Sequence, residues 1–333
     1  MDLLFSLDPL RRLVTTSLLV AASVPSPQTP TAPEAFPQRT VHLVVPFTAG
    51  GTTDIIARVI ADKLRTRLGQ PVVVDNRPGA STMIAAEQVA KAPADGYTLL
   101  LASSTTFSML PALRTSLPIP AEGAWAPIGI IAQAPVMLTT RADSGIKSFA
   151  DMLARASAQP GTVTYGTTGP GTAQYIVGAM IEADLHADIT PVSYRGSTQI
   201  LADVIGGQID LSLDPIAVAQ PYLESGKLRP LAISAGTRSP QYPGVPTFSE
   251  LGIAMPGNAF WFGIAAPRAT PQAVVERLEK ELQGVLLDPA VEAVFQRQSI
   301  WVMRGNAEDF RRRVQGEITQ YRRLAKDGKV KLE

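Results

Sequence analysis

The chain has 333 residues, of which 45% are hydrophobic and 18% charged, and its net charge is +1. This composition is typical of a globular protein of one large or two ordinary domains, and the balanced charge gives no support for nucleic-acid binding. There are no cysteines and only two histidines, His42 and His186. Thiol catalysis, disulfides and thiolate or histidine-rich metal sites are therefore excluded, and we expect neither a metal nor a cofactor.

The first 35 residues differ from the rest of the chain. Arg11 and Arg12 precede a run of small and apolar residues at 13–24, and Pro, Ser, Thr and Gln are then frequent up to Phe36. This order is typical of an export signal followed by an unstructured leader, although Asp2 and Asp8 stand where positive charge is usual. The alternative is a disordered tail. We expect residues 1–35 to be a signal peptide and leader.

Strand patterns then alternate with helix patterns, which favours parallel sheets with crossover helices. Strands are predicted at 41–45, 71–74, 97–102, 162–165, 189–192, 209–213 and 228–234. Helices are predicted at 53–68, 82–91, 149–158, 173–181 and 198–205, and the part after 270 is predicted to be helical to about 326. We expect loops at 111–127 and 240–256.

Two apolar stretches, at 128–138 and 260–266, are too long or too isolated to be assigned to the elements on either side of them. We interpret them as two strands that cross between two α/β lobes and form the hinge. Each lobe would contain a central sheet flanked by helices. The first lobe would then comprise 36–137 with 258–333, and the second lobe would comprise 138–257.

A short apolar strand runs directly into a glycine loop at 41–54, with the sequence V-H-L-V-V-P-F-T-A-G-G-T-T-D. Pro46 ends the strand pattern, and Gly50 and Gly51 precede a helix pattern that begins near Thr53. The first N–H groups of a helix have no partner within it, and the helix dipole places positive potential there. The segment therefore predicts an anion site that needs no charged side chain.

A second strand, glycine loop and helix follow one another at 162–181, with the loop sequence G-T-T-G-P-G-T at 166–172. Both loops would lie at the carboxyl ends of their strands, where open α/β sheets bind ligands. Together with the loops 79–82, 103–106 and 194–197 they offer N–H groups and hydroxyls suited to a carboxylate. Two such loops suit a small ligand with two polar ends. The same residue types also occur merely as turns and caps.

Three charged residues stand in or beside these loops. We expect Asp54 to cap the first helix or to lie in its first turn, since a general base there would weaken an anion site. Arg195 follows a strand and either pairs with a ligand carboxylate or is a solvated loop charge. Asp214 ends a strand and either receives a ligand ammonium group or caps the next helix, and the cap is favoured.

Aromatic residues near the loops also have two interpretations. Trp261 and Phe262 could wall a ligand cleft, but core packing is favoured. Tyr165 and Tyr175 flank the second glycine loop and could close over a ligand. His42 lies within the first strand, where we expect a structural role.

Motifs of known catalytic sites are missing. The sequence has no G-x-S-x-G elbow, no P-loop, no H-E-x-x-H and no G-x-G-x-x-G directly after a strand. We therefore expect a binding protein rather than an enzyme. An enzyme acting in the same cleft is the alternative, and it lacks a visible pair of nucleophile and base.

Six segments carry a more specific signal. They are V-V-P-F-T-A-G-G-T-T-D (44–54), D-N-R-P-G-A (75–80), A-P-A-D-G-Y-T-L-L (92–100), Y-R-G-S (194–197), G-G-Q-I-D (206–210) and R-S-P-Q-Y-P-G-V-P-T (238–247). In this order they resemble the Bug family, the periplasmic solute receptors of tripartite tricarboxylate transporters. The resemblance runs from about Phe36 to the C-terminus.

The resemblance implies a two-lobed α/β Venus-flytrap fold, like the type II periplasmic binding proteins, that closes on a small carboxylated solute. It implies a periplasmic location and handover of the solute to membrane transporter subunits, or in some members to a sensor kinase. Such receptors usually work as monomers. Their first-lobe carboxylate loop matches 47–53, and their second-lobe loop matches 167–172.

The expected ligand-binding residues lie in these loops and at the strand end of Asp214. They are Phe47, Ala49, Gly50, Gly51, Thr52, Thr53, Ser81, Thr82, Ser103, Ser104, Thr105, Thr167, Thr168, Gly169, Gly171, Thr172, Tyr194, Arg195 and Asp214.

The chain departs from the family pattern opposite the carboxylate loop. Ser81, Thr82 and Met83 stand where the family usually has Gly-Gly-Asn. Pro170 replaces the usual Asn, and Gln174-Tyr175 replace a common Ser-His pair. A standard ligand such as citrate or aspartate is therefore not implied.

Overall fold

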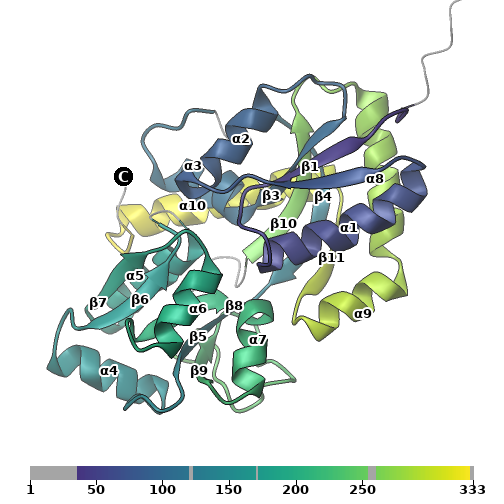
Figure 1. Cartoon of the computed structure of the whole chain (residues 1–333). Coiled ribbons are helices and arrows are strands. Elements are labelled where there is room, and N and C mark those ends of the chain that lie inside the picture. The colour runs from purple at the N-terminus through teal and green to yellow at the C-terminus, as the bar shows by residue number, and fades with distance from the viewer. Residues whose placement is uncertain (1–35, 120–122, 170–171, 254–259, 331–333) are drawn as a thin grey trace, which may run out of the picture. The chain divides into compact units, whose positions relative to one another are not determined.

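The structure is a computed structural model that describes residues 36–119, 123–169, 172–253 and 260–330. The expected signal peptide and leader lie outside the described residues. Two sheets with flanking helices make up the described chain (Figure 1). We call the six-stranded sheet and its helices the first lobe, and the five-stranded sheet and its helices the second lobe. Among the described helices, none has the length and apolar character that crossing a membrane requires.

The first lobe has the strand order β11-β4-β10-β3-β1-β2. β1 is parallel to β2 and β3, whereas β10 is antiparallel to β3 and β4, and β11 is antiparallel to β4. Its strands are β1 (Val41–Val45), β2 (Val72–Asn76), β3 (Thr98–Ser103), β4 (Trp125–Ala134), β10 (Phe260–Pro267) and β11 (Trp301–Gly305). Its helices are α1 (Thr52–Leu68), η1 (Ala80–Thr82), α2 (Met83–Ala90), η2 (Thr105–Met109), α3 (Leu110–Leu113), α8 (Gln272–Leu286), α9 (Pro289–Arg297) and α10 (Ala307–Lys326).

The second lobe has the strand order β7-β6-β8-β5-β9. β6 is parallel to β7 and β8, whereas β5 is antiparallel to β8 and β9. Its strands are β5 (Val136–Arg141), β6 (Val163–Thr167), β7 (Ile189–Ser193), β8 (Leu211–Pro215) and β9 (Leu228–Ile233). Its helices are α4 (Phe149–Ala158), α5 (Ala173–Leu185), α6 (Ser197–Ile205) and α7 (Ile216–Glu224).

The expected α/β class is confirmed, but the two sheets are mixed rather than purely parallel. The apolar stretch 128–138 is not one crossing strand, because Pro135 separates β4 in the first sheet from β5 in the second. Proline lacks an N–H group and restricts the residue before it, so the chain changes sheets there. The other stretch, 260–266, lies wholly within β10 of the first sheet.

Several elements were not predicted from the sequence. The helix α7 follows Pro215 and contains Pro221, which interrupts a helix pattern. The edge strand β11 is five residues long and half exposed, and it lies in the part after 270 that the sequence predicts to be helical. The helices η2 and α3 extend over 105–113, beginning within the predicted hydroxyl loop and reaching the start of the predicted loop at 111–127.

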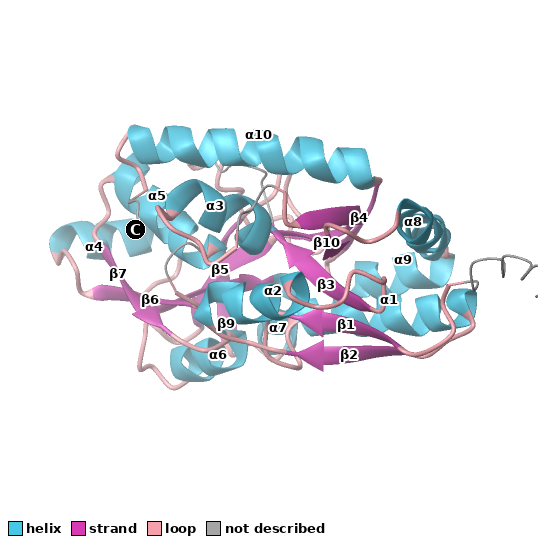
Figure 2. Cartoon of the chain, turned by 90° about the horizontal axis from the view of Figure 1, so that it is seen from above, coloured by secondary structure: helices cyan, strands magenta, loops and turns pink. Residues whose placement is uncertain are grey.

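A buried polar contact fixes α10 against the first-lobe sheet. Trp261 on β10 is fully buried, and its Nε1–H donates to Glu317 Oε2 at 2.6 Å. Arg313 Nε donates to the other carboxylate oxygen of Glu317 at 2.9 Å. Phe310 meets the Trp261 ring edge to face at 5.1 Å. These contacts hold α10 along β4 and α3, the position seen in Figure 2.

We predict that Glu317→Ala lowers the free energy of unfolding by about 3 kcal/mol, because it removes the acceptor of the buried Trp261 N–H and the carboxylate that pairs with Arg313. Chemical denaturation followed by Trp fluorescence measures this change. The matched control is Glu308→Ala on the same helix, whose side chain is 80% exposed; its effect should stay within about 1 kcal/mol. Equal losses in the two variants would contradict a structural role for the buried contact.

Candidate functional site

The loop between β1 and α1 leaves a helix N-terminus open. Gly50 has a φ of 81°, which favours glycine, and the N-cap residue Gly51 is extended. No side chain caps α1. The first N–H groups of an α-helix have no partner within the helix, so an uncapped N-terminus presents them to an external acceptor.

Asp54 lies in the first turn of α1, as one of the two expectations had it, and it holds this loop rather than capping the helix. Its buried carboxylate accepts hydrogen bonds from Gly50 N–H at 3.0 Å, Arg58 Nε at 2.9 Å and Asn76 Nδ2 at 3.1 Å. Asn76 Nδ2 also donates to Phe47 O at 3.1 Å. Burial alone would raise the pKa of the Asp54 carboxyl, but these bonds and the Arg58 charge outweigh it and lower the pKa. The carboxylate therefore stays ionised and neutralised by Arg58.

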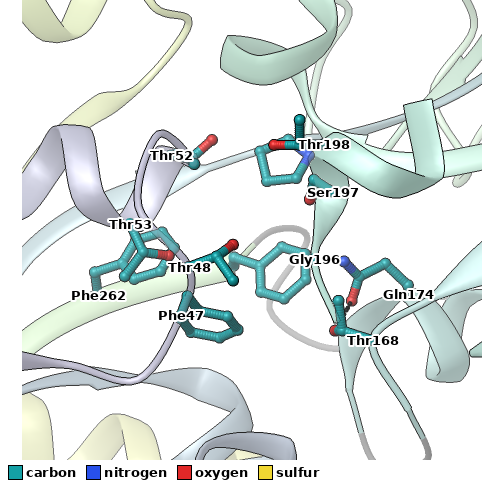
Figure 3. A pocket seen from close by; sticks show the side chains of 13 residues that line it. Phe47, Thr48, Thr52, Thr53, Thr168, Gln174, Gly196, Ser197, Thr198 and Phe262 are labelled. Atoms are coloured by element: carbon teal, nitrogen blue, oxygen red, sulfur yellow. Dashed lines mark hydrogen bonds between the residues drawn. The ribbon is translucent and has the colours of Figure 1, made fainter. Parts of the chain in front are cut away.

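The second-lobe loop is also braced by its own side chains. Thr167 Oγ1 accepts from Gly169 N–H at 3.2 Å, and Thr172 Oγ1 donates to Gly169 O at 2.6 Å. Gly169 has a φ of 113°. Thr168 Oγ1 donates to Gln174 Oε1 at 3.2 Å, which orients the Gln174 amide (Figure 3). The N-terminus of α5 has no side-chain cap.

A cleft lies between the loops of the two lobes and consists of two adjoining cavities. The first encloses about 530 Å³ of empty space, part of it open to solvent. It is lined by Phe47, Thr48, Gly51, Thr52, Thr53, Thr168, Gln174, Gly196, Ser197, Thr198, Pro215, Phe260 and Phe262 (Figure 3). The second shares Phe47, Thr48 and Thr168, and adds Pro46, Pro78, Gly79, Ala80, Ser81, Thr82, Thr172, Tyr194 and Arg195.

The two walls of the cleft approach each other closely at two glycines. A Cβ atom on Gly196 would lie 2.7 Å from Thr48 Oγ1 of the first lobe. A Cβ atom on Gly169 would lie 3.2 Å from Ser81 Oγ, again across the cleft. Gly196 is extended, with a φ of 176°, so the close approach rather than the backbone conformation requires glycine there.

The turn at 79–82 carries backbone strain. Gly79, Ala80, Ser81 and Thr82 all have positive φ, and Thr82 has a φ of 85°. Non-glycine residues rarely adopt this region, least of all β-branched ones. Thr106 Oγ1 donates to Thr82 Oγ1 at 2.9 Å and holds it in place. Serine and threonine hydroxyls thus line the cleft at positions where the backbone would favour glycine.

The structure brings most of the expected ligand-binding residues to this cleft. Those that line it are Phe47, Gly51, Thr52, Thr53, Ser81, Thr82, Thr168, Thr172, Tyr194 and Arg195. Those that do not line it are Ala49, Gly50, Ser103, Ser104, Thr105, Thr167, Gly169 and Asp214. Gly171 and the departure at Pro170 lie outside the described residues.

Several residues have roles other than those expected. Ser103, Ser104 and Thr105 are buried where β3 passes into η2, rather than forming an exposed loop. Asp214 does not cap α7, because the N-cap of that helix is Pro215 and no side chain caps it. Tyr165 is a core residue, and burial raises the pKa of its hydroxyl.

The outcomes differ for the other residues that had two interpretations. Trp261 belongs to the core as favoured, whereas Phe262 lines the cleft. Arg195 is exposed at the second cavity, where no ion pair is recorded for it among the described residues. His42 Nδ1 lies 2.8 Å from Asp75 Oδ2 on the neighbouring strand.

Gln174, Thr198 and Phe260 were not among the expected binding residues, and Ser197 was expected only as part of the loop 194–197. Gln174 and Thr198 lie just after predicted loops, and Phe260 begins an apolar stretch. Gln174 and Ser197 stand in the first turn of α5 and at the start of α6, so the helix N-terminus signal alone could have included them.

Two α/β lobes that face each other across a cleft lined by strand-end loops define the class of two-lobed binding proteins. A family model described as the tripartite tricarboxylate transporter family receptor matches residues 56–329. The chain belongs to this family, which confirms the resemblance to the Bug proteins.

Relatives and solved structures agree with this assignment. Protein BugT of Bordetella pertussis is 30% identical over 305 residues, which cover 91% of this chain and 94% of that protein. The structure of R. palustris Rpa4515 with adipate has a TM-score of 0.84 and 33% identity, and covers 90% of this chain and 100% of that one. MatC from Rhodopseudomonas palustris with bound malate has a TM-score of 0.81 and 31% identity, with coverage of 87% and 99%.

We predict that Gly196→Ala separates the lobes, because the added methyl group overlaps Thr48 Oγ1. Overpacking of this kind typically costs about 1–3 kcal/mol, here relieved by opening. Small-angle X-ray scattering should show a larger radius of gyration. The double variant Thr48→Ala with Gly196→Ala should restore the parental value. Gly145→Ala is the control, since a Cβ there meets nothing within 4 Å. An unchanged radius for Gly196→Ala would show that the contact does not limit closure.

Proposed function

We propose that the protein is exported and binds a small carboxylated solute, a mono- or dicarboxylate, in the cleft between its lobes. The observation that carries this proposal is the uncapped N-terminus of α1, which lies at the cleft opposite the second-lobe loops. Backbone N–H groups at such a terminus bind an anion without a charged side chain. The Asp54 charge does not oppose binding, because Arg58 pairs with it.

The lining of the first cavity supports a carboxylate ligand. The Thr52 hydroxyl is buried in this wall and has no hydrogen-bond partner among the residues that the structure describes. Thr48 and Thr53 add hydroxyls on the same side, whereas Phe47, Phe260 and Phe262 supply apolar walls. A few placed donors within an apolar lining are typical of small-molecule sites.

The comparisons support the same ligand class. Rpa4515 is described with adipate and MatC with bound malate, and both of these ligands are carboxylates. We infer that 47–53 bind the carboxylate, and that the turn 79–82 of the same lobe selects among carboxylates together with Gln174 and Arg195 of the opposite wall. Ligand contacts to both walls would favour the closed arrangement of the lobes, since a ligand stabilises the state in which it makes more contacts.

The bound solute would be delivered, by a monomeric receptor in the periplasm, to a tripartite tricarboxylate-type transporter. A receptor that presents the closed state to a membrane sensor kinase is the alternative. Genes for membrane transporter subunits beside this one would favour transport, and a sensor kinase gene in that position would favour signalling.

A test of the proposal is isothermal titration calorimetry of the mature protein with mono- and dicarboxylates of two to eight carbons. We expect at least one to bind with a dissociation constant at or below about 10 μM, which corresponds to roughly −7 kcal/mol. The solute should be recovered unchanged by mass spectrometry. No binding within the solubility range would refute the carboxylate proposal, and conversion of the solute would favour the enzyme alternative.

A second prediction tests whether the carboxylate binds at the loop that contains Gly51. A Cβ on Gly51 would meet only Thr48 O, at 3.7 Å, and Gly51 has a φ of −84°, so a side chain there fits the backbone and extends into open space. Gly51→Val should therefore fold normally and weaken binding of the best carboxylate at least about 100-fold, a loss of roughly 3 kcal/mol. Gly145→Val, at an exposed second-lobe position, is the control. A folded Gly51→Val protein with parental affinity would remove this loop from the site.

A further inference from the structure

The last described residues of the chain pass from the first lobe to the second. Helix α10 packs on β4, η2 and α3 of the first lobe and ends at Lys326. Just beyond this end, Lys329 Nζ lies 2.7 Å from Asp184 Oδ1 on α5 of the second lobe. Figures 1 and 2 both show the C-terminal end of α10 beside α5. The two lobes are therefore joined here by residues that do not line the cleft.

The turn after α10 fixes the direction in which the chain leaves the helix. Gly328 has a φ of 74°, and its N–H donates to Ala325 O at 3.1 Å. Lys329 N–H donates to Leu324 O at 2.9 Å. Two such bonds around a left-handed glycine form a Schellman motif, which ends a helix in a defined geometry. The backbone of Lys329 is thus held by the helix itself.

The contact is buried on the side of the second lobe. The Asp184 side chain is 9% exposed, and its Oδ2 has no hydrogen-bond partner among the described residues. Removing the cation from a buried carboxylate costs more than an exposed ion pair gains, because the remaining charge is left desolvated. Val330, which follows Lys329, is buried and belongs to the same apolar core as residues of α5 and α10. We call residues 327–330 the C-terminal clasp.

Helix α5 connects this contact to the cleft. Thr172, its N-cap residue, and Gln174 in its first turn line the cleft, whereas Asp184 lies in its last turn. The helix has 13 residues and no internal proline, so its two ends are about 20 Å apart. The C-terminal clasp and the second-lobe wall of the cleft are therefore at opposite ends of one helix.

The contact occurs together with a narrow cleft. In the same structure, a Cβ atom on Gly196 would lie 2.7 Å from Thr48 Oγ1 across the cleft. The chain changes sheets at Pro135, and rotation of the second lobe about this point moves α5 relative to α10, which stays packed on β4. An ion pair needs its charged atoms within about 4 Å, so a rotation that opens the cleft separates Lys329 from Asp184.

We propose that the C-terminal clasp stabilises the closed arrangement of the lobes through the ion pair of Lys329 with Asp184, and so raises the affinity of the cleft for its solute. The clasp increases the population of the closed state before the solute arrives. The apparent dissociation constant falls in proportion to that population, since only the closed state makes all of the ligand contacts. The effect on affinity rests on the proposed function, whereas the effect on the arrangement of the lobes does not.

Small-angle X-ray scattering of the unliganded protein tests the clasp without any solute. Lys329→Ala should have a larger radius of gyration than the parent, and Asp184→Asn, which removes the other charge, should have the same larger radius. Lys329→Arg keeps the charge and should keep the parental radius. The matched control is Lys326→Ala, because Lys326 is exposed at the end of the same helix and no ion pair is recorded for it among the described residues. Its radius should not change.

Calorimetry with succinate, glutarate and adipate gives the second readout. For whichever of the three binds most tightly, Lys329→Ala should weaken binding at least about fivefold, because the closed state is less populated. Lys326→Ala should bind within about twofold of the parent. Circular dichroism confirms that each variant is folded, and Asp184→Asn replaces Lys329→Ala in both measurements if the latter does not fold.

The outcomes separate this inference from the proposed function. An unchanged radius in folded Lys329→Ala overturns the clasp, and so does an affinity that is unchanged or tighter. Lower thermal stability with the parental radius and affinity is the behaviour of an ordinary packing contact and overturns it as well. If no dicarboxylate binds and the wider carboxylate panel is also negative, the proposed function fails, and the radius of the unliganded variants alone decides whether the clasp stands.

Discussion

The Asp54 carboxylate determines the geometry on which the binding cleft depends. It accepts hydrogen bonds from the Gly50 N–H, the Arg58 guanidinium and the Asn76 side-chain amide. The same Asn76 amide also donates to the Phe47 carbonyl. The end of β1, the end of β2 and the first turn of α1 are thereby joined around one buried charge. With the loop fixed and Asp54 neutralised, the uncapped N-terminus of α1 remains electropositive and faces the cleft.

Across the cleft from the N-terminus of α1, the second-lobe wall has different features. Because Gly196 and Gly169 lack side chains, Thr48 and Ser81 of the first lobe can lie close to them. Glycine at these two positions therefore sets the distance between the lobes rather than providing backbone flexibility. The left-handed turn at 79–82 holds Ser81 and Thr82 at the cleft despite the strain. In the function we propose, the N-terminus of α1 holds the anion, and the turn 79–82 together with the second-lobe wall distinguishes one solute from another.

The parts of the fold that follow local rules were predictable from the sequence. Ser148 and Asn306 cap α4 and α10, and such caps can be recognised in a sequence because a cap depends only on a few neighbouring residues. The order of strand, glycine loop and helix placed Gly51 and Thr168 at the cleft without knowledge of the rest of the chain. In contrast, the exchange of sheets at Pro135 and the burial of Ser104 under the first-lobe helices depend on which strands pair and which helices pack.

The central claim is that the N-terminus of α1 is where the carboxylate of the solute binds. A crystal structure of the mature protein with its best-binding carboxylate tests this most directly. We expect a carboxylate oxygen within about 3 Å of at least one backbone N–H of 50–54, the distance of a charge-assisted hydrogen bond, with the rest of the solute against Gln174 and Ser197. A carboxylate bound elsewhere in the cleft, with the α1 N–H groups facing only water, would contradict it.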